Sequence, residues 1–543
     1  MLLSKLAKRG CFLLLLLIIA FYFYGLGYLP LVGPDEPRYA QVAREMFLRG
    51  DLITPTLAGY NWFEKPALLY WMMQFAFGLF GVSEWSARLG PAICGVLTIV
   101  AIHCAGKRVG TLAGDPDLRR LGCVSALIIA STPGIIIFSR AASFDIVVTM
   151  TLTVALACFL LAELELDSKR RRAMLISFYV MMGISLLAKG LIGLVIPFGV
   201  IFLYYILRRS LPKGPVVSSL LWGLPLTILV ASIWYGPVIA RHGWNFIDQF
   251  FVQHHFARYL SNKYSHPQPF FFYFLIIFPL ALPWLVLTIK QLRNARNWNW
   301  TTRTPLDQFR LFCLAWLAMP LLFFSLSGSK LPGYILPVLP PMAFLAGEQL
   351  TRFLRGNQSF TPMRMMGGSL LLFVVGSVAY VAISGILSLA FAVLIVLPLL
   401  IAGVLALVHP QLKLVATGSI AMAIPLTIVL ALNCGVPQIA TRHSVRYLIE
   451  QADALGYSSA LVYSLHEVNR GIEFYAAGRV VYGPDGQPRK FEGAEEILQE
   501  TNQTTALVIV PLQWVHQLTE LESTEALVIA DNGELAIVRL QRK

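Results

Sequence analysis

Long apolar runs separated by short polar connections make up most of the first 434 residues of the chain. A helix that crosses the hydrocarbon core of a bilayer needs about 20 residues, with some variation on either side. Runs of about this length lie at 11–31, 87–106, 121–139, 143–164, 173–188, 190–207, 216–239, 270–289, 309–328, 334–351, 366–385, 387–408 and 412–434. The pattern predicts an α-helical polytopic membrane protein with about 13 transmembrane helices.

The connection after the first run, residues 33–86, is unusually rich in polar and aromatic residues. Its apolar residues recur at helical spacing, namely at Tyr39, Val42, Ala43, Met46 and Phe47. This stripe predicts a helix on the membrane surface, which Asp35 can cap and Gly50 can end. A second helix, from Pro66 to about Gly81, would reach only about 24 Å, so we expect it to be half-embedded rather than spanning.

Lysines and arginines test the number of spans, because they gather on the cytoplasmic connections of membrane proteins. Here they fall mainly at 107–120, 169–172, 208–213, 290–303 and 352–364, and at Lys413. With the runs counted as above, these connections all lie on the side of the N-terminus, which predicts that residues 33–86 and the C-terminus are extracytoplasmic. Counting 66–81 as a full span would place nearly all of them outside.

The composition changes at about Gly435, where polar residues return. Short β-like runs lie at 460–465, 479–482, 506–510, 526–530 and 535–540, and helical stretches lie at 444–455 and 493–501. We therefore expect two domains: a transmembrane domain over residues 1–434 and a small extracytoplasmic α/β domain over residues 435–543.

Composition agrees with a membrane protein. The chain is 57% hydrophobic and 13% charged, with a mean hydropathy of +0.67, whereas soluble proteins carry about 25% charged residues. The net charge is +14. The lysines and arginines are distributed as membrane orientation requires, so this charge does not indicate a nucleic-acid partner. The seven cysteines lie mostly inside apolar runs, which predicts neither a disulfide framework nor a thiolate metal site.

Candidate chemistry gathers on the connections predicted to be extracytoplasmic. The first of them holds Asp35, Glu36, Arg38, Tyr60, Glu64 and Lys65, and later ones hold Asp145, Lys189, His254, His255, Arg258, Lys330 and Tyr334. Two of these residues have plain alternative roles. Asp145 could cap the fourth helix, and Lys189 could snorkel from a helix end.

These residue types indicate a lipid-linked substrate. Lysine and arginine at the membrane interface bind phosphate, and arginine can do so through two parallel hydrogen bonds. Apolar helices would enclose a long tail, and acids facing the same cavity could hold groups of a sugar. We expect acids and cations from separate connections to meet in one water-accessible hollow beside the lipid.

Three motifs carry a family resemblance: Asp-Glu-Pro-Arg-Tyr-Ala at 35–40, Phe-Glu-Lys-Pro at 63–66 and Lys-Leu-Pro-Gly-Tyr-Ile-Leu-Pro at 330–337. They resemble those of the lipid A 4-amino-4-deoxy-L-arabinose transferases, which are GT-C membrane glycosyltransferases. The resemblance implies a GT-C fold and transfer of the aminosugar from undecaprenyl phosphate to a phosphate of lipid A. It places this reaction on the periplasmic face of a bacterial inner membrane, in a monomer without an organic cofactor.

The resemblance also implies residue roles. Asp35, Glu36 and Asp145 would be catalytic; Lys65, Arg258, Lys189, Tyr60, Tyr334, Arg38 and Lys330 would bind substrate; and Glu64 with His254 or His255 could bind a divalent metal such as zinc.

Two alternatives stay open. Related enzymes that transfer mannose or galacturonate share the acidic first loop, so the sugar could differ. A transporter of a lipid-linked substrate is the alternative from another class, although transporters tend to carry ionisable groups near the bilayer midplane.

Overall fold

The computed structural model describes residues 2–257, 268–300, 304–356, 358–436, 444–483, 486–500, 505–521 and 524–542, with the backbone alone at 2–12 and 254–257. The chain divides into two compact units. Unit 1 comprises residues 1–24, 63–69 and 89–430, and unit 2 comprises residues 25–62, 70–88 and 431–543.

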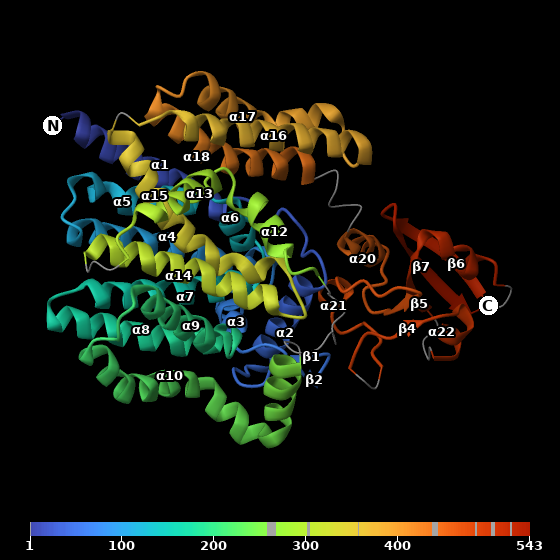
Figure 1. Cartoon of the computed structure of the whole chain (residues 1–543). Helices are drawn as coiled ribbons and strands as arrows, with labels where there is room; N and C mark the ends of the chain where they lie inside the picture. The colour runs from blue at the N-terminus through green and yellow to red at the C-terminus, as the bar shows by residue number, and fades with distance from the viewer. Residues whose placement is uncertain are drawn as a thin grey trace. The chain divides into compact units, whose positions relative to one another are not determined.

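Helices form nearly all of unit 1 (Figure 1). They are α1 (Leu2–Phe23), α4 (Glu84–Leu112, whose first residues belong to unit 2), α5 (Leu121–Ala130), α6 (Pro133–Ser139), α7 (Phe144–Leu164), α8 (Ser168–Lys189), α9 (Ile192–Arg208), α10 (Gly214–Ile247), α12 (Phe272–Ala281), α13 (Leu285–Arg293), α14 (Pro305–Leu326), α15 (Leu339–Arg355), α16 (Thr361–Ser384), α17 (Leu389–Val408) and α18 (Lys413–Leu430). Short helical turns are η1 (Pro116–Arg120), η2 (Asp248–Ala257), η3 (Asn294–Asn297) and η4 (Pro332–Val338).

The prediction of a polytopic helical membrane protein is confirmed. Within the described residues, eight helices are long and apolar enough to cross a membrane, or ten if each of two bent pairs forms one span. The bent pairs are η1 and α5 with α6, at 61°, and α12 with α13 and η3, at 118°. The predicted number is larger because it also counted α1, α9 and α15. Of these, α9 and α15 have only 17 residues each, and the side chains of α1 are described only from Leu13.

Neighbouring helices in sequence often pack together in unit 1. Helices α7 and α8 form one such pair, and α16, α17 and α18 form a layer at one edge of the bundle (Figure 1). The turn η4 packs against α7 and α14. That contact brings residues 332–338 next to the beginning of α7.

Unit 2 contains the first loop together with the C-terminal domain. The first loop supplies α2 (Asp35–Arg49), a hairpin of β1 (Thr56–Leu57) and β2 (Tyr60–Asn61), and most of α3 (Leu68–Phe80). The C-terminal part contains η5 (Ala431–Gly435), α20 (Val445–Ala454), β3 (Leu461–Leu465), α21 (Ile472–Tyr475), β4 (Lys490–Phe491), α22 (Ala494–Glu500), β5 (Thr505–Pro511), η6 (Leu512–Trp514), α23 (His516–Thr519), β6 (Thr524–Asp531) and β7 (Leu535–Arg542).

The C-terminal strands form one mixed sheet, in the order β4-β3-β5-β7-β6. Strand β3 pairs in parallel with β4 and β5, and β7 pairs antiparallel with β5 and β6. Two separate clusters of buried apolar residues line the sheet. The predicted small α/β fold is confirmed, although residues 479–482 contribute only isolated bridges to Val462 and Pro488.

Three local predictions in the sequence were wrong. Asp35 does not cap α2: the helix is preceded by Pro34 without a side-chain cap, and Asp35 is its first residue. The apolar stripe of α2 is buried in protein, because α3 packs on it through ring contacts of Tyr39 with Tyr70 and Phe47 with Phe77. Cys123 is disulfide-bonded despite lying at the start of an apolar run. Gly50 does end α2, with φ of 63°.

Candidate functional site

The first cluster of predicted site residues lies in unit 1, where α7 and α8 meet η4. Asp145 is in the first turn of α7, and Lys189 is the last residue of α8. The Lys189 ammonium forms an ion pair with Asp145 Oδ1 and lies 4.3 Å from the centre of the Tyr334 ring. The structure therefore brings together three residues that the sequence singled out separately.

This arrangement rules out the plain alternatives for both charged residues. The Ser143 hydroxyl caps α7 by accepting a hydrogen bond from the Asp145 backbone N–H at 3.1 Å, so the Asp145 carboxylate is not the cap. The Lys189 side chain is only 11% exposed, so it does not snorkel toward water. A largely buried ammonium that faces one carboxylate and one aromatic ring can bind an anion once the carboxylate turns aside.

Two neighbours that the sequence reasoning missed make this cluster possible. A Cβ atom at Gly333 would overlap the Asp145 carboxylate, so only glycine permits this approach of η4 to α7. The buried Tyr273 hydroxyl donates to the Leu331 carbonyl at 3.2 Å and holds the start of η4. The Lys-Leu-Pro-Gly-Tyr motif contained the signal for Gly333, since a glycine beside a proline marks a tight turn. No signal in the sequence marked Tyr273.

Lys330 and Lys65, also in unit 1, have partners of their own. The buried Lys330 ammonium donates to the backbone carbonyls of Ser327 at 2.7 Å and Gln268 at 3.0 Å. Lys65 pairs with Glu64 at 2.7 Å, and both side chains are about nine-tenths buried. Phe63 anchors this segment by packing on the rings of His242 and Phe246 in α10.

The second cluster lies in unit 2, at the start of α2. The Asp35 carboxylate is 47% exposed and accepts a hydrogen bond from Arg38 Nη2 at 2.6 Å. The Arg38 guanidinium also lies 5.2 Å from the centre of the Trp62 ring. An exposed carboxylate at a helix N-terminus, held by one arginine, is available to a substrate.

Glu36 differs sharply from its neighbour Asp35. It is 7% exposed and accepts two hydrogen bonds from Arg88, at 3.0 and 2.7 Å. Arg88 also donates to three backbone carbonyls, those of Leu26, Leu29 and Pro30. This pair ties the segment before α2 to the start of α4, which favours a structural task for Glu36.

Tyr60 lies at the tip of the first-loop hairpin and is 48% exposed. The hairpin is fixed to α2 by Glu45, another residue that the sequence reasoning missed. Its carboxylate accepts hydrogen bonds from the Thr56 hydroxyl at 2.7 Å and from the backbone N–H groups of Ala58 and Gly59. Tyr60 is thus presented to solvent on a fixed turn.

Some predictions lie outside what the structure describes. Arg258 falls in the undescribed range, and so do the side chains of His254 and His255. The residues of unit 1 and unit 2 each form their own cluster, and the predicted common hollow for Asp35, Lys65, Asp145 and Arg258 stays a prediction.

Two relatives of known sequence are similar to this chain over much of its length. A protein from Pseudomonas aeruginosa is 32% identical over 356 residues, which cover 64% of this chain and 61% of that protein. A second, from Aeromonas salmonicida, is 32% identical over 346 residues. Both are named undecaprenyl phosphate-alpha-4-amino-4-deoxy-L-arabinose arabinosyl transferase. The match thus spans about three fifths of the length of these relatives.

Solved structures show the same fold. ArnT from Cupriavidus metallidurans, bound to undecaprenyl phosphate, superposes with a TM-score of 0.79 over 98% of both chains at 22% identity. The archaeal oligosaccharyltransferase AglB from Archaeoglobus fulgidus gives a TM-score of 0.50 over 94% of this chain and 70% of that one, at 14% identity. At these identities the likeness concerns the fold alone.

A family model matches residues 9–289, which include α2, the Phe63–Leu69 segment and the Asp145–Lys189 pair. Its description is dolichyl-phosphate-mannose-protein mannosyltransferase. The chain therefore belongs to this family of membrane glycosyltransferases.

Proposed function

We propose that the chain is a membrane glycosyltransferase that moves 4-amino-4-deoxy-L-arabinose from undecaprenyl phosphate to a phosphate group of lipid A. The reaction would take place at the periplasmic face of a bacterial inner membrane. The names of the relatives support the sugar and its carrier, and the neighbouring ArnT structure holds undecaprenyl phosphate. The lipid A acceptor rests on the family resemblance of the first-loop and Lys330–Pro337 motifs.

The observation that carries the proposal is the largely buried Lys189 ammonium with its two partners, Asp145 and Tyr334. A cation that is desolvated and held in place is worth more to a developing phosphate charge than one in water. In the proposed reaction the bond between the sugar and the undecaprenyl phosphate breaks, and the leaving phosphate gains negative charge. Lys189, with Lys65 and Arg258, would stabilise that charge.

The acceptor needs little activation. A phosphate monoester has a second pKa of about 6 and is already largely ionised at neutral pH. No general base is then required, unlike for a sugar hydroxyl. Catalysis would rest on alignment of donor and acceptor and on the cations. Asp35 and Asp145 would orient the aminosugar or the cationic side chains.

Purified protein tests the proposal directly. We expect lipid A incubated with the undecaprenyl-phosphate aminosugar to gain the mass of one aminopentose, as read by mass spectrometry. Undecaprenyl-phosphate mannose is the matched donor, since the family description names mannose. Transfer of mannose and not of the aminosugar would overturn the proposed sugar and identify mannose as the sugar transferred. No transfer with either donor in detergent, where transport has no meaning, would favour a transporter.

A zinc ion held by Glu64 with His254 or His255 is part of the same proposal. Carboxylate and imidazole are ligands that zinc accepts, but Lys65 already engages Glu64 Oε1. The described residues contain no group of three or more potential ligands arranged around a metal. We expect metal analysis of purified protein to find about one zinc per chain, lost in Glu64→Gln; equal zinc in both proteins would remove Glu64 from the site.

A further inference from the structure

The C-terminal domain meets the first loop through the short helix α21, within unit 2. The Tyr475 hydroxyl accepts a hydrogen bond from the Leu31 backbone N–H at 2.8 Å and donates to Glu84 Oε1 at 3.0 Å. Arg44 of α2 donates to the Phe474 carbonyl at 3.2 Å, and its guanidinium lies 5.7 Å from the Phe474 ring centre. Helix α21 thus contacts α2 and the segment that leads into it.

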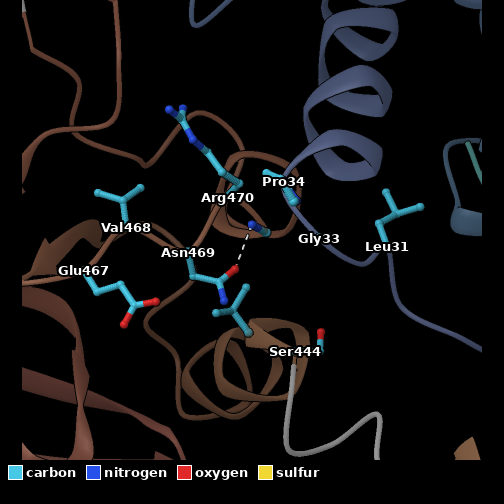
Figure 2. A pocket seen from close by; sticks show the side chains of 10 residues that line it. Leu31, Gly33, Pro34, Ser444, Glu467, Val468, Asn469 and Arg470 are labelled. Carbon is cyan, nitrogen blue, oxygen red and sulfur yellow. Dashed lines mark hydrogen bonds between the residues drawn. The ribbon is translucent and has the colours of Figure 1, made fainter. Parts of the chain in front are cut away.

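The junction is not closely packed throughout. A pocket of about 290 Å³ separates Leu31, Gly33 and Pro34 from the Glu467–Gly471 loop and the start of α20. Figure 2 shows this loop on one side and the first-loop segment on the other, with Asn469 bound to the Gly471 backbone. Close packing does not fill this part of the junction, so hydrogen bonds such as Tyr475–Leu31 help to hold the first-loop segment there.

Glu473 of α21 is a buried carboxylate at this junction, and its burial is energetically unfavourable. It is fully buried, and its Oε1 lies 3.3 Å from Arg470 Nη1. Among the described residues its Oε2 atom receives no hydrogen bond. A buried carboxylate oxygen without a hydrogen bond destabilises a fold, so its presence needs an explanation.

The charged residues near Glu473 include two from α2, Arg38 and Glu45. Burial raises the pKa of Glu473, while Arg470 and Arg38 lower it and Glu45 of α2 raises it further. The pKa of Tyr482 is also raised, first by burial and then by the nearby Glu473 carboxylate. Arg38 is the residue that holds Asp35. Glu473 therefore lies within electrostatic range of Arg38, the partner of the proposed active-site acid.

We propose that Glu473 and Tyr475 are positioning residues through which the C-terminal domain presents Asp35 to the substrate. Tyr475 holds the backbone that leads into α2. Glu473 pairs with Arg470 at the base of α21, while its carboxylate lies within electrostatic range of Arg38. Neither residue touches the reacting atoms. The inference rests on the proposed function, in which Asp35 contacts the aminosugar or the cations around it.

The test replaces Glu473 by glutamine, which keeps the shape and removes the charge. We expect the turnover number to fall between about 3-fold and 30-fold. We expect the Tm to change little, because the Arg470 side chain is 25% exposed and also donates to Gln487, so it keeps a partner and access to water. Tyr475→Phe should lower turnover in the same range. Glu492→Gln is the matched control, because Glu492 is 64% exposed in the same domain and pairs with Lys490 and His466.

A double-variant cycle separates positioning from a merely structural role. If Glu473 acts through Arg38, adding Glu473→Gln to Arg38→Ala should change turnover by less than about twofold. Multiplying effects, or an unchanged turnover in Glu473→Gln alone, would overturn the inference. So would a fall in Tm that accounts for the lost activity.

Hydrogen exchange makes the test independent of the proposed reaction. Glu473→Gln and Tyr475→Phe should speed exchange at residues 31–49 several-fold and leave strands β5 and β7 unchanged. If exchange is faster in the variants but the parent protein shows no transferase activity, the positioning role stands and the proposed function is wrong. Unchanged exchange at 31–49 would sink the positioning role alone.

Discussion

At the scale of single residues, the Asp145–Lys189 pair combines a proposed catalytic role with a stability cost. Removing one partner leaves the other charge largely buried and without its ion-pair partner, which lowers stability by up to about 3 kcal/mol. We expect Asp145→Asn and Lys189→Met each to lower transfer about 100-fold and to lower the Tm. The double variant should regain much of the Tm and none of the transfer, as measured by thermal unfolding and by turnover in detergent.

Lys490→Gln is the control for that cycle, because Lys490 is an exposed lysine of the C-terminal sheet. It should behave as the parent protein in both measurements. A double variant that transfers the sugar at the parent rate would show that the pair is structural only.

Gly333 allows a second prediction at this scale. In Gly333→Ala the added methyl group would overlap the Asp145 carboxylate and the Phe138 ring. We expect η4 to move away from α7 and transfer to fall at least about tenfold, with a lower Tm. Gly376→Ala is the matched control, since nothing lies within 4 Å of the position; alanine there should stabilise α16 by about 0.5 kcal/mol or more. Equal activity in both variants would contradict the close approach.

The sequence pointed to Asp145, Lys189 and Tyr334 because each interrupts or borders an apolar run. It could not show that the first two pair, because they are 44 residues apart on different helices. Local spacing predicts only contacts within one helix or hairpin. The same limit explains Glu36, which looks like Asp35 in sequence while its partner Arg88 lies 52 residues away.

At the scale of elements, Glu36 and Arg88 fix where α2 begins. Both side chains are less than 10% exposed. We expect Glu36→Gln to lower the free energy of unfolding by about 3 kcal/mol, because it leaves the Arg88 charge without its carboxylate. Transfer per folded molecule should change little. A variant with unchanged unfolding and a large loss of transfer would instead assign Glu36 to catalysis, as the family resemblance implies.

The existence of α2 and its end at Gly50 were predictable, because helical periodicity and a left-handed glycine are local signals. What the apolar stripe of α2 packs against was not predictable. An amphipathic stripe fits a membrane surface and a protein neighbour equally well, and here α3 covers it. The C-terminal strands were predictable for the same local reason, whereas their order in the sheet depends on long-range pairing.

At the scale of the whole molecule, unit 2 joins two parts of the chain that lie on opposite sides of the long helical region in sequence. Leu31 and Arg44 bond directly to Tyr475 and Phe474. Both parts must therefore lie on the same side of a membrane. The chain between them, from α4 to α18, must cross an even number of times. The predicted spans between residues 87 and 434 satisfy this condition, and it fails if α3 is added as a further span.

This parity predicts where reporter fusions will be active. With the N-terminus in the cytoplasm, alkaline phosphatase, which folds only after export, should be active when fused after Ala58 or after Lys543. It should be inactive when fused after Arg209 or Gln411, which lie in connections that carry lysine and arginine. Green fluorescent protein at the same positions should show the reverse pattern. Opposite signals after Ala58 and Lys543 would be incompatible with the Tyr475–Leu31 hydrogen bond, because the two groups would then lie on different sides of the membrane.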